Sequence, residues 1–415
     1  MRASDPFEDI DVDPRRTLMA TSAVLVVLAI GAVLFPTQAA VVAVIVALFV
    51  MIMLHELGHF LAAKRSGMKV TEFFVGFGPR LWSIKRGETE YGVKAVPLGG
   101  YCRIIGMTNL EEVAPEDEPR AYRNKRTGAK VFVAAAGPAV HFVIALVLMF
   151  VVLFAAGDFR SQHAVLTLAD TTQGAAAAGL RPGDTIVAVN GTPVSSWPQV
   201  QQLINPSAHP AHVGDVVRFV VRRGGQQLEV PVTLQQSADP SLKRVVAGVA
   251  PRTVVAHPGL VTSIVQAPLQ VVDIGWQSIK AIGSMFSPAG ISNYFRILSG
   301  DTSSHTDQSK RFVSPAGVGA LASDAVKAGW VSVFGLLIAI NIFVGLFNLL
   351  PLLPFDGGHI AIALYERVAS RVRRQRVQVD AAKLLPITVA VVAVLGFIFL
   401  SSLFLDITNP VANPF

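Results

Sequence analysis

The chain has 415 residues, of which 52% are hydrophobic and only 15% are charged. Because a soluble domain carries roughly a quarter charged residues, this composition argues against a soluble protein and predicts several membrane spans. We attribute the net charge of +7 to basic cytoplasmic loops and expect no nucleic-acid partner. The single cysteine, Cys102, excludes an internal disulfide and a zinc cluster built from cysteines.

The first apolar region is long enough for two membrane helices. Residues 17–54 contain no charged side chain, and a span needs about 20 residues. A turn at Pro36-Thr37-Gln38 interrupts the run, so we predict helices at 17–35 and 40–63. The preceding segment 1–16 is acidic, which is not typical of a signal peptide, and we interpret 17–35 as a retained anchor.

The next segments predict a β-structure and a third span. Short alternating pieces in 64–129, separated by glycine-rich turns, indicate a membrane-associated β-hairpin or sheet. An apolar run at 130–155 contains Gly137-Pro138 and predicts the next transmembrane helix.

The middle of the chain has ordinary polarity and β-rich stretches between glycine and proline turns. Within 160–250, Gly179–Ile186 followed by Val189-Asn190-Gly191 resembles a PDZ domain, which implies an inserted α+β module. An amphipathic helix and a loop are predicted for 259–310. Spans at 330–359 and 384–405 complete the predicted fold class, a membrane α-helical bundle of about five transmembrane helices with this inserted PDZ-like domain.

Basic residues predict the orientation of these spans. Arg15 and Arg16 precede the first helix, the 64–130 loop carries 13 Lys or Arg residues, and the 366–383 loop carries six. Five crossings put all three regions on one side, which the positive-inside rule makes cytoplasmic. The N-terminus then lies in the cytoplasm, while the PDZ-like module and the C-terminus lie outside it.

The second predicted span carries His55-Glu56-Leu57-Gly58-His59. Residues i and i+4 share one face of a helix, so His55 and His59 can bind one Zn²⁺, with Glu56 as general base. Gly58 allows another segment to approach closely. Two histidines and a carboxylate are costly inside a bilayer unless they have a function. His59 lies five residues before Lys64, about 7–8 Å inside the charged boundary.

A catalytic zinc needs a third protein ligand, and Asp356 is the best candidate. The fourth span also runs toward the cytoplasm, so it brings Asp356 to a similar depth. Pro351 and Pro354 break the helix before it, and the glycines at 357 and 358 give the backbone freedom. An alternative is that Asp356 only caps the following helix.

Four segments together resemble the site-2 protease family of zinc intramembrane metalloproteases. They are HELGHF (55–60), VKAVPLGGYC (93–102), AAGPAV (135–140) and NLLPLLPFDGGH (348–359). The resemblance implies zinc ligands His55, His59 and Asp356 and the catalytic base Glu56. It is greatest to the bacterial branch that cleaves anti-sigma factors, which implies a bacterial cell membrane and single-span substrates already cut by another protease. The helix at 17–35 is additional to the family core.

The resemblance also implies that Asn348 and the 93–101 segment help to engage the substrate. An unwound substrate needs backbone partners, which an exposed strand edge supplies. Asn348 has amide donors and an acceptor for the same purpose, or it makes a hydrogen bond between helices. The residues predicted to bind substrate are Asn348, Val96, Pro97, Leu98, Gly99, Gly100 and His141.

His141 departs from the family pattern, which often has asparagine four residues after the glycine of the GP pair. We favour a polar replacement that contacts substrate or water. A hydrogen bond to a neighbouring helix and a role as metal ligand are the alternatives.

For the PDZ-like module we expect control of access of substrates to the active site, with a substrate stub or peptide as its ligand.

Two other classes of protein fit the sequence less well. The intact HExxH motif and Asp356 argue against a non-proteolytic scaffold. The absence of an internal sequence repeat argues against a zinc-containing transporter.

Overall fold

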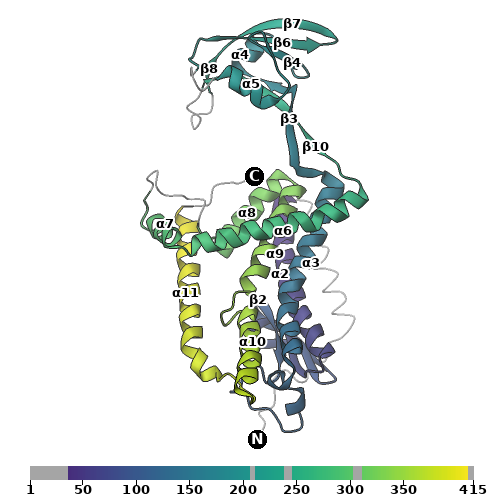
Figure 1. The fold of residues 1–415 in the computed structure, drawn as a ribbon, viewed down its shortest axis with the longest axis vertical. Helices are drawn as coiled ribbons and strands as arrows, with labels where there is room; N and C mark the ends of the chain where they lie inside the picture. Colours follow the sequence, from purple (N-terminus) through teal and green to yellow (C-terminus); the bar gives the residue numbers. More distant parts are fainter. Residues whose placement is uncertain (1–35, 206–210, 238–244, 302–310, 410–415) are drawn as a thin grey trace. The chain divides into compact units, whose positions relative to one another are not determined.

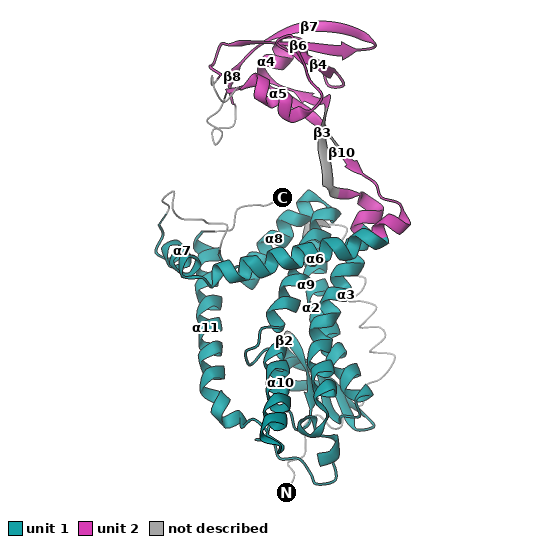
Figure 2. Cartoon of the chain, viewed as in Figure 1, with its two compact units in different colours: residues 1–151, 264–415 teal, residues 152–263 magenta. Residues whose placement is uncertain are grey.

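The computed structural model describes residues 36–205, 211–237, 245–301 and 311–409. The chain divides into two compact units, Met1–Val151 together with Ile264–Phe415, and Val152–Ser263 (Figure 2). The span predicted at 17–35 lies outside the described residues.

Four helices among the described residues are long and apolar enough to cross a membrane. They are α2 (Pro36–Arg65), α3 (Thr127–Ala156), α9 (Trp330–Asn348) and α11 (Ala381–Thr408) (Figure 1). The prediction of a multi-pass membrane protein is therefore confirmed.

The segment predicted as one helix at 330–359 forms two helices instead. Helix α9 ends at Asn348, seven residues of turn follow, and α10 (Asp356–Arg373) begins. The reason is local, because Pro351 and Pro354 cannot donate the backbone hydrogen bonds that would continue α9.

Helices α2, α3, α8 (Pro315–Ala328) and α9 share one apolar cluster in the first unit. Val44 and Met51 of α2, Ala322 of α8 and Leu337 of α9 form its buried part, and Ile144 and Leu148 of α3 pack against it. This apolar cluster fixes the spans that carry the functional residues.

Two long strands, β1 (Val70–Arg86) and β2 (Thr89–Ile104), follow α2. Both are irregular, and their register makes four adjacent strand segments in the order Trp82–Arg86, Thr89–Val93, Glu72–Val75 and Gly100–Arg103. Gly100–Arg103 is therefore one edge of this sheet. Ala63 of α2, Val70 of β1 and Val133 of α3 belong to one buried cluster, which joins the sheet to both spans.

The chain between the sheet and α3 contains two short 3₁₀ turns, Glu118–Arg120 and Tyr122–Asn124.

The second unit is a β-rich module. Its main sheet has the order β10-β3-β4-β6-β7, formed by β3 (Asp158–Thr171), β4 (Thr185–Val189), β6 (Val216–Arg223), β7 (Gln226–Thr233) and β10 (Val249–Ala256). Short elements complete the unit: α4 (Gln173–Ala177), α5 (Trp197–Ile204), β5 (Thr192–Pro193), β8 (Gln235–Gln236) and β9 (Val245–Val246). Phe219 and Val200 lie in its buried core. Asp184 pairs with Arg223 through two hydrogen bonds of 2.7 and 2.6 Å.

The predicted amphipathic segment 259–310 contains α6 (Leu260–Met285) and α7 (Pro288–Leu298), and residues 302–310 lie outside the described part. Polar contacts fasten α11 to this region of the first unit. Tyr294 of α7 is hydrogen-bonded to Ser401 at 2.7 Å. Arg311 forms a buried ion pair with Asp406 at 2.7 Å.

Candidate metal centre and active site

His55 and His59 lie on one face of α2, as the four-residue spacing predicts. Both side chains are buried, and their Nε2 atoms are 3.1 Å apart. Two imidazole nitrogens that face each other so closely in a buried position require a proton or a cation between them.

Asp356 reaches this pair because the chain folds back tightly after α9. A Cβ on Gly357 would collide with the carbonyl oxygens of Leu349 and Leu350, and one on Gly358 would lie 2.7 Å from backbone atoms of Leu352 and Leu353. The two glycines are therefore required by close packing rather than by unusual backbone angles. They allow the first turn of α10 to pack directly on the preceding turn.

The three side chains fit a zinc ion. Nε2 of His55 is 3.3 Å from Oδ2 of Asp356, and Nε2 of His59 is 3.3 Å from Oδ1 of the same carboxylate. Ligands at about 2.0–2.1 Å from a tetrahedral zinc are roughly 3.3–3.4 Å from each other, so each of these two contacts has the length expected between two ligands of one zinc. Oδ2 of Asp356 is buried without a hydrogen-bond partner among the described residues, as a free metal ligand would be. His55, His59 and Asp356 can therefore hold a metal ion.

Helix α3 orients the histidines and leaves room for them. Nδ1 of His59 donates to the carbonyl of Val133 at 2.8 Å, so its Nε2 carries the lone pair that a metal needs. A Cβ on Gly137 would collide with Nε2 of His59 and lie 2.7 Å from two atoms of the His55 ring. Gly58 plays the reciprocal part, because its Cβ would lie 2.7 Å from the carbonyl oxygen of Ala136. The close approach expected at Gly58 is thus present.

Glu56 lies between the histidine pair and the edge of the sheet. Its carboxylate accepts a hydrogen bond from the backbone amide of Cys102, in the edge segment Gly100–Arg103. Gly100 also packs against α2, since a Cβ there would lie 2.6 Å from Sδ of Met53. Burial, together with the nearby Glu56 carboxylate, raises the pKa of the Cys102 thiol to about 12, so this thiol stays protonated at neutral pH.

His141 lies beside the metal group on α3. Its ring centroid is 5.1 Å from that of His55, and its Nδ1 is 2.8 Å from Oδ1 of Asn341 on α9. This is the hydrogen bond between helices that the sequence left as an alternative. The three-residue metal group does not include His141.

The other residues that the sequence singled out lie outside the three-residue metal group. Asn348 is the last residue of α9, partly exposed, and the structure gives its side chain no hydrogen-bond partner among the described residues. Val96, Pro97, Leu98 and Gly99 belong to β2 just before the edge segment, and Val96 is exposed. His359 packs edge-on against Tyr122 and is not part of the metal group.

Three contributors were missed from sequence. The carbonyl of Val133 and the space at Gly137 carry no signal of their own outside the folded structure. Asn341 does carry one, because it is an amide side chain in the middle of the apolar span 330–348, and such residues are usually partnered.

A histidine pair and a glutamate on a membrane-spanning helix, completed by a carboxylate from a distant helix, define an intramembrane zinc metalloprotease. The comparisons agree with this class. The model of peptidase family M50 matches residues 43–395. The zinc metalloprotease Rip1 of Mycobacterium tuberculosis is 35% identical over 88% of this chain and 96% of its own length. Rip1 of Mycolicibacterium smegmatis is 34% identical over the same shares of both chains.

The chain therefore belongs to peptidase family M50, the site-2 proteases. It is a multi-pass zinc intramembrane metalloprotease, as the sequence resemblance predicted.

Proposed function

We propose that this enzyme performs regulated intramembrane proteolysis near the cytoplasmic face of a bacterial cell membrane. Its substrates would be single-span membrane proteins, with anti-sigma factors as the class that the resemblance favours. One observation carries the proposal. The metal group, Glu56 and the sheet edge Gly100–Arg103 come together beside the same part of α2.

His55, His59 and Asp356 would hold the zinc, which when bound supplies Lewis acidity for the scissile carbonyl and the attacking water. Glu56 takes a proton from that water and returns it to the leaving amine. The amide of Cys102 orients the Glu56 carboxylate toward this task. Burial of the histidines keeps bulk water from competing for the metal position.

Substrate binding is proposed for the edge of β2 and for Asn348. Among the described residues, the Gly100–Arg103 segment has a strand neighbour on one side only, so an unwound substrate can add along its other side. The preceding residues Val96, Pro97, Leu98 and Gly99 would extend the same edge. The Asn348 amide, which the described part of the chain leaves without a partner, would bind a substrate backbone group.

His141 would contact substrate or water through Nε2. Nδ2 of Asn341 donates to the carbonyl of Leu337 at 2.8 Å, so its Oδ1 must be the group that faces His141. Nδ1 of His141 is then the donor in that bond, and its Nε2 is left as an acceptor. An acceptor beside the metal group suits the peptide N–H of a bound substrate or a water molecule.

The proposed topology follows the basic residues. Segments 1–16, 64–129 and 366–383 would be cytoplasmic, and 160–250, 259–310 and the C-terminus extracytoplasmic. Helices α2, α3, α9 and α11 would then be crossings in addition to the anchor at 17–35.

For the second unit we propose a PDZ-like domain that gates substrate access. A cavity of about 650 Å³ lies between α5 and residues 245–250, and every residue that lines it is uncharged. Such a groove suits an extended, uncharged peptide, as a trimmed substrate stub would present. Deletion of 164–250 should permit cleavage of substrates that have not been cut by an earlier protease. Unchanged selectivity would refute the gating role.

The proposal as a whole is tested by Glu56→Gln with a single-span substrate in the same membrane. The variant should retain zinc and lose cleavage, whereas Glu112→Gln at an exposed position should cleave normally. Cleavage retained by Glu56→Gln would defeat the proposal.

A further inference from the structure

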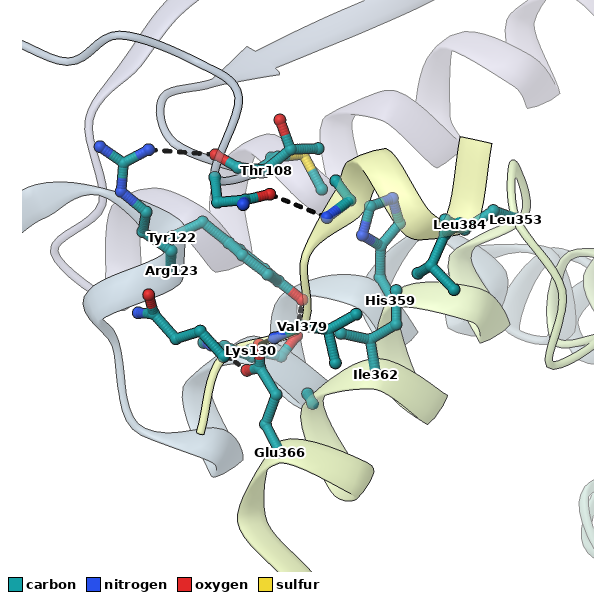
Figure 3. Close-up of a pocket in the computed structure, with 15 residues that line it drawn as sticks. Thr108, Tyr122, Arg123, Lys130, Leu353, His359, Ile362, Glu366, Val379 and Leu384 are labelled. Atoms are coloured by element: carbon teal, nitrogen blue, oxygen red, sulfur yellow. Dashed lines mark hydrogen bonds and ion pairs between the residues drawn. The ribbon is translucent and has the colours of Figure 1, made fainter. Parts of the chain in front are cut away.

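Helix α10 has two faces of opposite character. His359, Ile362, Ala363 and Glu366 line a small cavity within the first unit, and Figure 3 shows three of them beside Tyr122, Lys130 and Leu384. On the other side of the helix, Leu364, Val368 and Val372 follow one another at intervals of four residues and are exposed.

The packed face holds the helix firmly in place. Glu366 forms an ion pair of 2.8 Å with Lys130 at the start of α3, and both side chains are largely buried. The same carboxylate accepts a hydrogen bond of 3.0 Å from the backbone amide of Val379, in the connection to α11. Because these contacts fix the rotation of α10 about its axis, they also fix the direction of the exposed face.

The exposed face is strongly apolar. Leu364 is 49% exposed, Tyr365 55%, Val368 63% and Val372 77%. These positions fall within about 100° around a helix with 3.6 residues per turn, so they form one continuous stripe. A stripe of this kind needs an apolar partner.

Arginines accompany the stripe. Arg367, Arg371, Arg373 and Arg374 are all exposed, and the structure pairs none of them with an acidic side chain of the described residues. Arg367 and Arg371 are one turn apart and adjoin the stripe along one side. The partner should therefore carry negative charge next to an apolar region.

The short connections of α10 to its neighbouring helices indicate that its partner is the membrane. Seven residues join it to the span α9 and seven to the span α11, so the helix cannot move far from the bilayer. A basic amphipathic helix held in this way is suited to the boundary between acyl chains and lipid phosphates. Arginine stems can lie along the acyl chains while the guanidinium groups reach the phosphates.

We propose that this face of α10 binds anionic phospholipid. Leu364, Val368 and Val372 contact the acyl chains, and Arg367 and Arg371 contact the phosphate groups. Because Asp356 is the first residue of the same helix, lipid bound at the far end steadies the element that delivers the third metal ligand.

The test uses the full-length protein in vesicles, with a maleimide fluorophore on a Val372→Cys variant. The native thiol of Cys102 is only partly exposed, and its pKa of about 12 keeps it protonated at neutral pH, so the label goes to the exposed position 372. Brominated phosphatidylglycerol or brominated phosphatidylcholine is added at equal mole fraction to a mixture of both lipids. The label should be quenched more strongly by brominated phosphatidylglycerol.

Arg367→Gln with Arg371→Gln should reduce that lipid preference, by about fivefold for each arginine. The matched control, Arg181→Gln with Arg222→Gln, removes two exposed arginines of the second unit and should leave the preference unchanged. Thermal melting shows whether each variant is folded. Equal quenching by the two lipids, or no quenching by either, overturns the proposal. The readout involves no proteolysis, so it succeeds or fails separately from the proposed function.

Discussion

Replacement of Gly137 by alanine should remove zinc from a protein that remains folded. The added Cβ would lie 2.7 Å from two atoms of the His55 ring and closer still to Nε2 of His59, whereas comfortable contacts are about 3.5–4.0 Å. If helix α3 moved away instead, it would lose the close packing of Val140 and Ala136 against Gly58 of α2. The imidazoles must therefore shift.

The expected loss of zinc affinity follows from how little the metal–ligand distances can change. Overpacking of this kind costs about 1–3 kcal/mol, which a protein of this size can survive. Metal–ligand distances, however, hold within about 0.2 Å, so a displaced histidine should weaken zinc binding at least 10–100-fold. The assay is a chelator competition titration of the purified protein, with thermal melting measured in parallel.

The matched control is Gly128→Ala, in the first turn of α3, where nothing lies within 4 Å of an added Cβ. It should bind zinc as the unsubstituted protein does. If Gly137→Ala also binds zinc with unchanged affinity, the assignment of the metal position between α2 and Asp356 is refuted.

Three other predictions follow from the contacts. Asn341→Leu should slow cleavage while zinc stays bound, because His141 loses the acceptor 2.8 Å away that orients its ring; a normal rate would show that this orientation is unimportant. Asp406→Asn should lower the unfolding free energy by about 3–5 kcal/mol, since Arg311 would be left buried without its counter-charge; an unchanged melting temperature would contradict this. The hydrogen bonds from Arg120 and Lys64 hold the pKa of Glu88 at about 2, below its ordinary value of 4.5. Since the folded-state pKa is the lower one, this stabilisation is complete above about pH 4.5 and is lost as the pH falls toward 2. The melting temperatures of the unsubstituted protein and Glu88→Gln should therefore converge on acidification, and a constant difference would count against the ion pair.

The group of His55, His59 and Asp356, which can hold a metal ion, could be picked out from the sequence because its signals are local or additive. The spacing of His55 and His59 works on any helix, and their place in an apolar run makes a chance match improbable. Asp356 required one long-range step, which the count of spans supplied.

The other features of the site depend on tertiary packing, which the sequence patterns do not reveal. Gly357 and Gly358 were attributed to backbone freedom, whereas the structure uses them for close packing against the turn at 349–353. The pairing of His141 with Asn341 joins positions 200 residues apart. The edge at Gly100–Arg103 exists because the Glu72–Val75 part of β1 pairs with two different parts of β2, a register that alternation of residues does not encode.

The most direct test of the account is the zinc content of three purified full-length proteins measured side by side. The unsubstituted protein and Glu56→Gln should each hold about one zinc per chain, and Asp356→Ala should hold far less. This result would show a metal held jointly by α2 and the start of α10, with Glu56 outside the ligand set. Full zinc content in Asp356→Ala, or its loss from Glu56→Gln, would contradict the account.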